Sequence, residues 1–268
     1  MVTILGSAGF IGSAILASMR GGGEKVFAPL RDDPAIFERD LGHVIYAIGL
    51  TADFRSRPFD TVKAHVSVLA DILEQASFRS LTYLSSTRVY SGLQSAFAHQ
   101  SLSVEPANPS QLYNLTKLAG ESICLHCGHH STRIVRLSNV VGVGTIESNN
   151  FIDSLVRDAM TGRITVHSTP ESSKDYIHLQ DVIDWLPKIA REGKARIYNL
   201  ASGTNLTNEM WTKSLQALVD CQVTYNPEAP TNSFPQISIS ELQKEFSFSP
   251  RSAFDVLPDL IKHQQNKK

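Results

Sequence analysis

The stretch Gly6-Ser7-Ala8-Gly9-Phe10-Ile11-Gly12 decides the fold, because it joins an apolar run over residues 2–5 to a helical pattern that starts at residue 10. Glycines at this junction allow a tight turn and let a pyrophosphate approach the backbone, where free N–H groups at the helix start meet its charge. The G-x-x-G-x-x-G spacing differs from the commoner G-x-G-x-x-G, and an ordinary glycine-rich turn also fits it. The candidate cofactor-binding residues of this turn are Gly6, Gly9, Phe10, Ile11 and Gly12.

Short apolar runs alternate with helical patterns on both sides of this turn, up to about residue 200. This alternation is typical of βαβ units and a parallel sheet. The expected strands cover residues 2–5, 25–28, 43–47, 80–85, 133–137 and 196–200, and the expected helices cover residues 10–19, 60–75 and 111–126. The sequence therefore predicts the α/β class, with a doubly wound parallel sheet of the Rossmann type.

Two departures from a full dinucleotide fold are visible. Only residues 31–42 separate the second and third expected strands, where a further strand would normally lie, so we expect a short helix and a shortened sheet edge. After residue 140 the pattern loosens and prolines become frequent. We expect a Rossmann domain over residues 1–140 and about 168–202, and a smaller C-terminal substrate-binding lobe built from residues 141–167 and 203–268.

Size and charge exclude several classes of partner. A chain of 268 residues with 42% apolar side chains can bury a core without disulfides or a structural metal. Its 25 basic and 26 acidic side chains argue against a nucleic-acid or polybasic membrane contact, because both need an excess of Lys and Arg. The expected partner is a small molecule.

We expect a cytoplasmic protein for three reasons. The chain has only three cysteines, it has no basic leader before Arg20, and it has no long apolar run. The segment Cys124-Leu125-His126-Cys127-Gly128-His129-His130 has metal-ligand residue types, but no second ligand pair stands at zinc-finger spacing. We expect no metal site.

The end of the second expected strand bears on the choice between NAD and NADP. An acid there binds the ribose 2′-OH of NAD, whereas an arginine accommodates the 2′-phosphate of NADP. This chain has no acid at the strand end and has Arg31 just beyond it, which favours NADP(H) over NAD(H). Pairing of Arg31 with Asp32 or Asp33 at the surface is the alternative.

Tyr113 and Lys117 are four residues apart in a helical pattern, so their side chains project from one face. A nearby ammonium and the positive charge of an oxidised nicotinamide both favour the phenolate form of a tyrosine. Such a tyrosine can exchange a proton with a sugar hydroxyl while a cofactor takes or gives hydride. The pair therefore indicates oxidoreductase chemistry.

The order of the motifs resembles the extended short-chain dehydrogenase/reductase family, which contains nucleotide-sugar epimerases, dehydratases and reductases. Besides the glycine turn, the resemblance rests on the segments at residues 85–90, 113–117, 136–142, 174–182 and 198–203. The resemblance implies that Ser86 binds the sugar oxygen, that Tyr113 is the acid/base, and that Lys117 binds the cofactor ribose and stabilises the ionised tyrosine. It implies substrate diphosphate contacts for Asn139 and Lys174, where Lys174 replaces the usual arginine. A homodimer is also expected from the resemblance.

The resemblance narrows the reaction. Dehydratases of this family carry carboxylates at the positions that Thr87 and Arg88 occupy here, so elimination would lack its proton carriers. Reduction of a keto-sugar nucleotide and 4-epimerisation with retained NAD remain. The NADP-type arginine and the shortened edge favour cofactor exchange, and therefore the reductase. A non-catalytic NADP-binding sensor or scaffold is the alternative of a different class.

Overall fold

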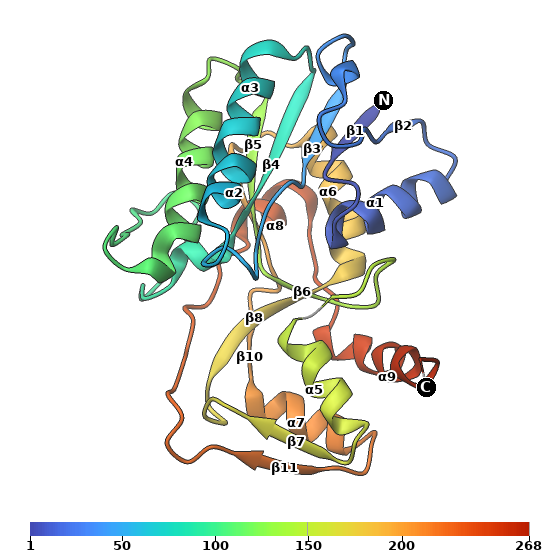
Figure 1. The fold of residues 1–268 in the computed structure, drawn as a ribbon, viewed down its shortest axis with the longest axis vertical. Coiled ribbons are helices and arrows are strands. Elements are labelled where there is room, and N and C mark those ends of the chain that lie inside the picture. The colour runs from blue at the N-terminus through green and yellow to red at the C-terminus, as the bar shows by residue number, and fades with distance from the viewer. Residues whose placement is uncertain (149, 268) are drawn as a thin grey trace.

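A six-stranded parallel sheet runs through the computed structural model, which describes residues 1–148 and 150–267 (Figure 1). Its strand order is β2-β1-β3-β4-β5-β9. The strands are β1 (Val2–Leu5), β2 (Val26–Phe27), β3 (His43–Tyr46), β4 (Ser80–Ser86), β5 (Thr132–Leu137) and β9 (Ile197–Leu200). Each strand matches a segment predicted from the sequence to within one residue at either end, so the doubly wound α/β fold is confirmed.

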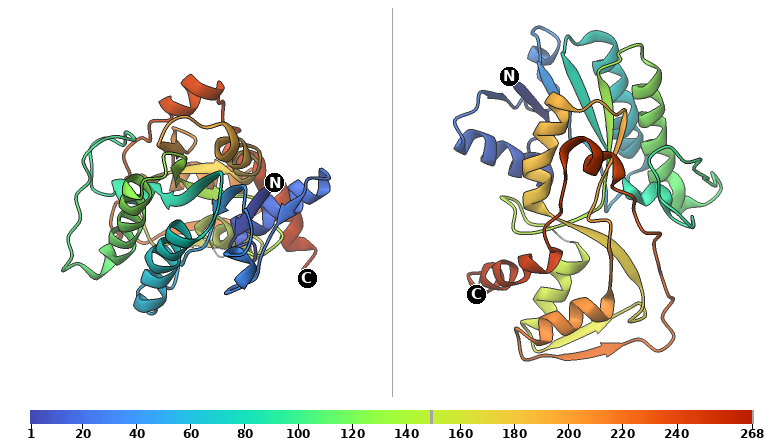
Figure 2. Two further views of the ribbon diagram at one scale, coloured as in Figure 1. Left: turned by 90° about the horizontal axis from the view of Figure 1, so that it is seen from above. Right: turned by 180° about the vertical axis from the view of Figure 1, so that it is seen from behind.

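Helices cover both faces of this sheet (Figure 2). One face packs against α1 (Phe10–Gly21) and α6 (Leu179–Glu192), and the other packs against α2 (Pro58–Val62), α3 (Val68–Gln75) and α4 (Leu112–His126). Side chains of a strand alternate between the two cores: Leu84 joins the first core and Tyr83 joins the second. Across residues 1–148 and 150–267, no helix combines the length and apolar composition that a bilayer crossing needs.

The sheet is shortened at its β2 edge, as the sequence predicts. Strand β2 has two residues, and it pairs only with β1. A 3₁₀ helix, Pro34–Ile36, stands where another strand could have formed, and Asp33 caps it by accepting a hydrogen bond from the N–H of Ala35 at 3.0 Å. The chain then turns directly into β3.

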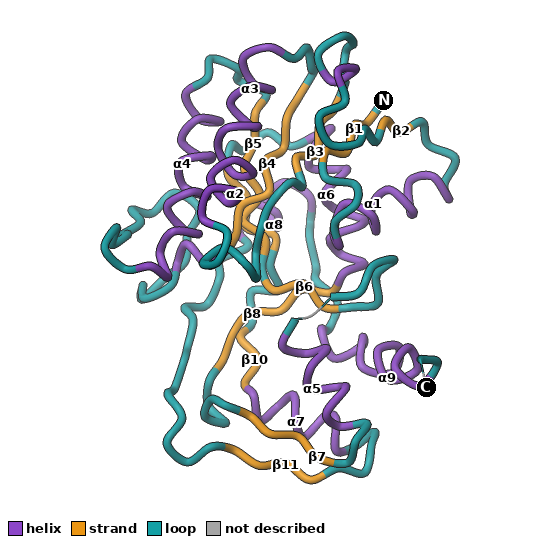
Figure 3. Tube along the Cα trace, in the orientation of Figure 1, coloured by secondary structure: helices purple, strands orange, loops and turns teal. Residues whose placement is uncertain are grey.

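A third hydrophobic core lies below the carboxyl ends of the sheet, among the elements in the lower part of Figure 3. It is centred on Trp211, whose ring lies 5.2 Å from that of Tyr176. Around it lie β6 (Asn139–Val141), β7 (Arg163–Val166), β8 (Ser173–His178), β10 (Asn205–Thr207), β11 (Gln222–Tyr225), α5 (Phe151–Ala159), α7 (Asn208–Gln216) and α9 (Leu257–Gln265). Strand β8 pairs with β6 and β10, and β7 pairs with β11.

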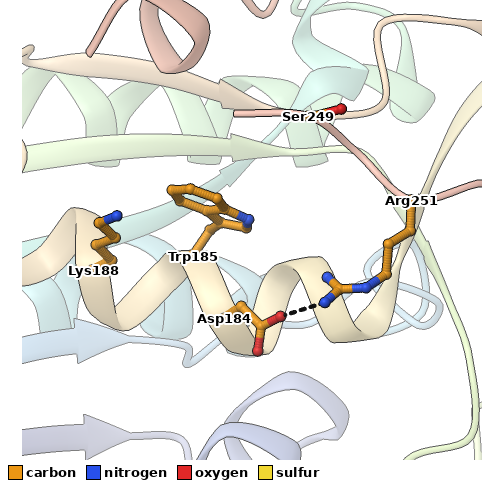
Figure 4. Close-up of a pocket in the computed structure, with 5 residues that line it drawn as sticks. All are labelled: Asp184, Trp185, Lys188, Ser249 and Arg251. Carbon is orange, nitrogen blue, oxygen red and sulfur yellow. Dashed lines mark ion pairs between the residues drawn. The ribbon is translucent and has the colours of Figure 1, made fainter. Parts of the chain in front are cut away.

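The chain returns to the first core between these elements. Helix α8 (Ser240–Phe246) places Leu242 there, and Phe248 packs edge-on against Trp185 of α6, with ring centroids 5.4 Å apart. Arg251 then pairs with Asp184 of α6 at 2.9 Å, beside a hollow of about 500 Å³ (Figure 4). None of the candidate site residues lines this hollow. The division of the chain into two domains at the stated boundaries stays a prediction.

A buried ion pair ties α4 to the centre of the sheet. The guanidinium of Arg136 on β5 donates to both carboxylate oxygens of Glu121 on α4, at 3.0 and 2.6 Å, and the two side chains are at most 4% exposed. Ser85 donates to the same carboxylate at 2.5 Å, and Arg136 donates to Tyr90 at 2.7 Å. Both charges are therefore satisfied inside the protein, and neither can be removed alone without leaving the other uncompensated.

We expect Glu121→Ala to lower the free energy of unfolding by about 3–5 kcal/mol, because it leaves Arg136 buried without its counter-ion. Urea denaturation of the two proteins measures this difference. Glu209→Ala removes an exposed ion pair with Lys213 and is the control, with an expected loss below about 1 kcal/mol. Equal losses in the two variants would contradict a structural role for the Glu121–Arg136 pair.

Candidate active site

The glycine turn is packed so closely that two of its positions exclude a side chain. A Cβ on Gly12 would lie 2.3 Å from the carbonyl oxygen of Gly6, and Gly6 itself has φ +87° and lies against the backbone of Ala47 after β3. Helix α1 begins at Phe10 without a side-chain cap, so its first N–H groups remain available to an anion. These features fit the pyrophosphate of a dinucleotide.

Arg31 lies in the exposed turn after β2. Within the described part of the chain it forms no ion pair with Asp32 or Asp33, and Asp33 is occupied in capping the following 3₁₀ helix. The described residues therefore do not show the alternative, in which Arg31 pairs with Asp32 or Asp33 at the surface. The Arg31 side chain is open to a ligand at the β2 edge, and its role in binding the cofactor stays a prediction.

Tyr113 and Ser86 meet where α4 crosses the carboxyl end of β4. Ser86 and Thr51 lie close enough to the phenol to lower its pKa, and the ring packs 5.6 Å from that of Phe54. Burial raises the pKa of Tyr113, while Ser86, the Arg88 charge and Thr51 act in the opposite direction. Burial prevails because Tyr113 is 5% exposed and loses its hydration. The role of Lys117 in favouring ionisation stays a prediction.

Lys117 is buried one helical turn further along α4. Its Nζ donates to the carbonyl of Leu84 at 2.8 Å and lies 5.9 Å from the centroid of the Tyr113 ring. Burial lowers the pKa of Lys117 to about 7, against the opposing charge of Glu121. A Cβ on Gly49, in the loop after β3, would lie 3.4 Å from this Nζ, so the amine faces the edge at which ligands of open parallel sheets bind.

His65 supports the same turn of α4. It lies in one π-helical turn, Lys63–Ser67, where Nε2 accepts from the N–H of Leu50 at 3.2 Å. Its Nδ1 therefore holds the proton and donates to Thr116 Oγ1 at 2.8 Å, and Thr116 donates to the Tyr113 carbonyl at 3.0 Å. Burial and the nearby Lys117 charge lower the pKa of His65 to about 3, so its imidazole stays neutral. Its ring meets the Tyr113 ring edge-on at 5.3 Å.

The two predicted substrate residues of the lower sheet lie on neighbouring strands. Asn139 begins β6, is exposed, and donates its amide to the backbone carbonyl of Asp175 at 2.8 Å. Lys174 lies on β8, and burial together with the charge of Arg88 lowers its pKa. Lys174 therefore shares one region with Arg88 and Tyr113, whereas Arg31 lies apart at the β2 edge. Among residues 1–148 and 150–267, no three His, Cys, Asp or Glu side chains are grouped as metal ligands.

A sequence profile of the NAD dependent epimerase/dehydratase family matches residues 2–201, from β1 to the end of β9. The chain belongs to the NAD dependent epimerase/dehydratase family. The resemblance stated from the ordered motifs is confirmed by this match. A comparison with curated proteins gives no match.

Solved structures share the fold of this epimerase/dehydratase family member at low sequence identity. MoeE5 in complex with UDP-glucose and NAD is 20% identical over 99% of both chains, with a TM-score of 0.80. MoeE5 in complex with UDP-glucuronic acid and NAD is 19% identical over 100% of this chain and 99% of that one, also with a TM-score of 0.80. RMD from Pseudomonas aeruginosa, complexed with NADPH, is 19% identical over 100% of both chains, with a TM-score of 0.77. The dTDP-glucose 4,6-dehydratase of Bacillus anthracis, in complex with NAD, is 18% identical over 99% of this chain and 96% of that one, with a TM-score of 0.79.

Three residues of this family member's site were not found from its sequence. His65 stands alone inside an apolar helical pattern, and Thr51 lies in a loop without a motif, so neither gives a local signal. In the sequence, Arg88 indicates only that the carboxylate of a dehydratase is missing at this position. Its position two residues after Ser86, just beyond the end of a buried strand, could have marked it as a site residue.

We expect His65→Gln to reduce the acid sensitivity of this protein. The folded state holds His65 with a pKa of about 3, whereas the unfolded state protonates it near pH 6.5, so stability is lost as pH falls from 6.5 towards 3. This residue alone adds about 1.4 kcal/mol per pH unit to that loss. Gln retains one donor and one acceptor, so the variant should lose less stability over the same interval.

Urea denaturation at a series of pH values measures the slope for each protein. His130→Gln, at an exposed position, controls for the loss of an imidazole. Identical slopes for wild type and His65→Gln would mean that His65 is protonated in the folded state as well.

Proposed function

We propose that this protein is an NAD(P)-dependent oxidoreductase that acts on a nucleotide-diphosphate sugar, and that it reduces a keto-sugar. The observation that supports this most is the meeting of Ser86, Tyr113 and Lys117 beside the loop after β3, against which the glycine turn also packs. A proton carrier, its hydrogen-bond partner and a buried amine then stand at the edge where open parallel sheets bind their ligands. Binding alone does not require this combination, which disfavours the non-catalytic sensor or scaffold.

The residues of the chain have separate tasks in this mechanism. A bound nicotinamide dinucleotide would supply the hydride, and the glycine turn with the start of α1 would hold its pyrophosphate. Ser86 and Tyr113 would hydrogen-bond the sugar oxygen at the reacting carbon. Because burial raises the pKa of Tyr113, the phenol is protonated at neutral pH and can give its proton to that oxygen as negative charge develops. Lys117 would bind the cofactor ribose and favour the ionised phenol that remains.

Support for a nucleotide sugar comes from two sources. MoeE5, which shares the fold, is described with UDP-glucose or UDP-glucuronic acid bound together with NAD. In this chain Asn139 and Lys174 are proposed to contact the substrate diphosphate from β6 and β8. Lys174 presents one ammonium rather than a guanidinium fork, so its contact with a phosphate would be that of a point charge.

The reaction type rests on what surrounds Tyr113. Thr87 is buried and lies 3.5 Å from the carbonyl of Leu137, and Arg88 is a cation, so neither offers the carboxylate that an elimination would use. Arg31 and the two-residue β2 favour an exchangeable NADP(H) over a retained NAD(H), and therefore reduction. A 4-epimerase with retained NAD is the second candidate, because MoeE5 is described with NAD. A homodimer and a cytoplasmic location are part of the proposal, as is the lack of nucleic-acid and membrane partners.

Replacing Tyr113 by Phe should lower kcat for reduction of a 4-keto sugar nucleotide about 10²–10⁴-fold, because the proton donor is lost while the ring that packs on Phe54 is kept. The decay of reduced-nicotinamide absorbance measures turnover, and isothermal titration calorimetry measures cofactor affinity, which should not change. Unchanged turnover would remove Tyr113 from the mechanism. No turnover by wild type, together with co-purified NAD, would favour the epimerase.

Replacing Arg31 by Ala should weaken NADPH binding about tenfold and leave NADH binding unchanged, because only NADPH carries the 2′-phosphate that a charged donor would bind. Calorimetric titration of both cofactors into both proteins measures this difference. Lys25→Ala, at the exposed start of the β2 segment, controls for the loss of one positive charge. Equal effects on the two cofactors would contradict the NADP(H) preference.

A further inference from the structure

Arg88 lies beside Tyr113, and two further cations from other segments, Arg55 and Lys174, lie near Arg88. Arg55 and Arg88 both reach Ser110, at 3.1 Å to its hydroxyl and 3.3 Å to its carbonyl, and both guanidinium groups stack on the ring of Phe54, at 4.5 and 5.0 Å. Lys174 on β8 is close enough for the Arg88 charge to lower its pKa. None of the carboxylates in residues 1–148 and 150–267 forms an ion pair with any of these three side chains.

This grouping is electrostatically unfavourable in the absence of an anion. Burial and the neighbouring Arg55 charge both lower the pKa of Arg88, which means that the protein does not compensate the charge there. The buried Arg136, by contrast, has Glu121 as a bidentate partner at 2.6 and 3.0 Å. Half-buried cations without counter-ions are stabilised when a ligand brings negative charge to them.

Arg88 stands closer to the chemistry than the other two cations. Its guanidinium lies 5.4 Å from the centroid of the Tyr113 ring, and its charge is among those that act on the pKa of that phenol. Its backbone N–H donates to Ser86 Oγ at 3.2 Å, so Arg88 is fixed two residues from the proposed sugar-binding hydroxyl. The guanidinium therefore lies beside the position at which Ser86 and Tyr113 would hold a sugar oxygen.

We infer that the substrate sugar carries a carboxylate, and that Arg88 binds it. The substrate class is then a nucleotide-diphosphate keto-hexuronic acid rather than a neutral keto-hexose, and the hexuronic acid itself is the product of reduction. This inference rests on the proposed function, because it uses Ser86 and Tyr113 to orient the sugar. The planar guanidinium fork matches a carboxylate in a way that a hydroxymethyl group cannot exploit. Lys174 remains for the diphosphate, and Arg55 adds positive potential at the entrance from the exposed loop after β3.

The competing account is that Arg88 serves only to tune the phenol. In that case its replacement would alter the reaction of neutral and acidic sugars to the same extent. The two accounts are separated by comparing sugars that differ only in the carboxylate, with binding measured apart from turnover.

Isothermal titration calorimetry with UDP-glucose and UDP-glucuronic acid, and with the corresponding thymidine diphosphate sugars, tests the inference on the full-length protein. Wild type should bind the glucuronate member of a pair about tenfold or more tightly than the glucose member, as expected for a charge-assisted bidentate contact. Arg88→Gln should abolish that preference, because it lowers the affinity for the glucuronate member about tenfold more than the affinity for the glucose member. Arg88→Lys should keep part of the preference, because the charge remains without the fork.

Arg163→Gln, at an exposed position on β7, is the matched control and should keep the full preference. Thermal unfolding of each variant shows whether it is folded. Equal affinity of wild type for the two members of a pair, or an equal loss for both in Arg88→Gln, overturns the inference and leaves the proposed function standing. If neither member of any pair binds, the proposed function fails together with it.

Discussion

The close contact between α4 and β4 positions the whole site. A Cβ on Gly120 would lie 2.6 Å from the Tyr83 hydroxyl and 2.7 Å from the carbonyl of His65, so only glycine lets the helix approach the strand and the π turn this closely. Three polar side chains of α4 then reach the sheet from successive turns. Glu121 accepts from Ser85, Lys117 donates to Leu84, and Tyr113 meets Ser86. Their spacing of four residues places them on one helical face, and that face follows β4 to its carboxyl end.

The close contact between α4 and β4 also disfavours charge on the side chains of the site. Helix α4 brings an amine and a phenol into a region with little water, so the charged form of each is disfavoured: the pKa of Lys117 falls to about 7 and that of Tyr113 rises. Protonation of His65 would add a further charge, but burial and the nearby Lys117 charge keep its imidazole neutral down to about pH 3. It can therefore hold Thr116 and the start of α4 in place without competing for protons.

The local sequence predicts the strands of the sheet, but it does not predict features that depend on contacts between distant segments. Each strand of the parallel sheet is a short apolar run bounded by turn residues, and the shortened edge follows from the few residues available between β2 and β3. The predicted helix over residues 60–75 is instead α2, a π turn and α3, because the bulge depends on His65 bonding to Leu50 in a distant loop. The return of α8 to the first core depends likewise on a contact between Phe248 and Trp185, which periodicity cannot reveal.

The charged groups of the molecule fall into two sets, and the division between them marks the site. Two deep carboxylates are bound by the chain itself: Glu121 pairs with Arg136, and Asp175 accepts hydrogen bonds from Ser138 and from the N–H groups of residues 202 and 203, at 2.5 to 2.9 Å. These hydrogen-bonded carboxylates stabilise the packing of the protein and are not free to bind a ligand. The cations around the carboxyl ends of the strands have no such partners, although burial makes them expensive. Glu121 and Asp175 show that the chain can satisfy deep charges, so the isolation of these cations is best explained by a negatively charged molecule that completes the arrangement when it binds.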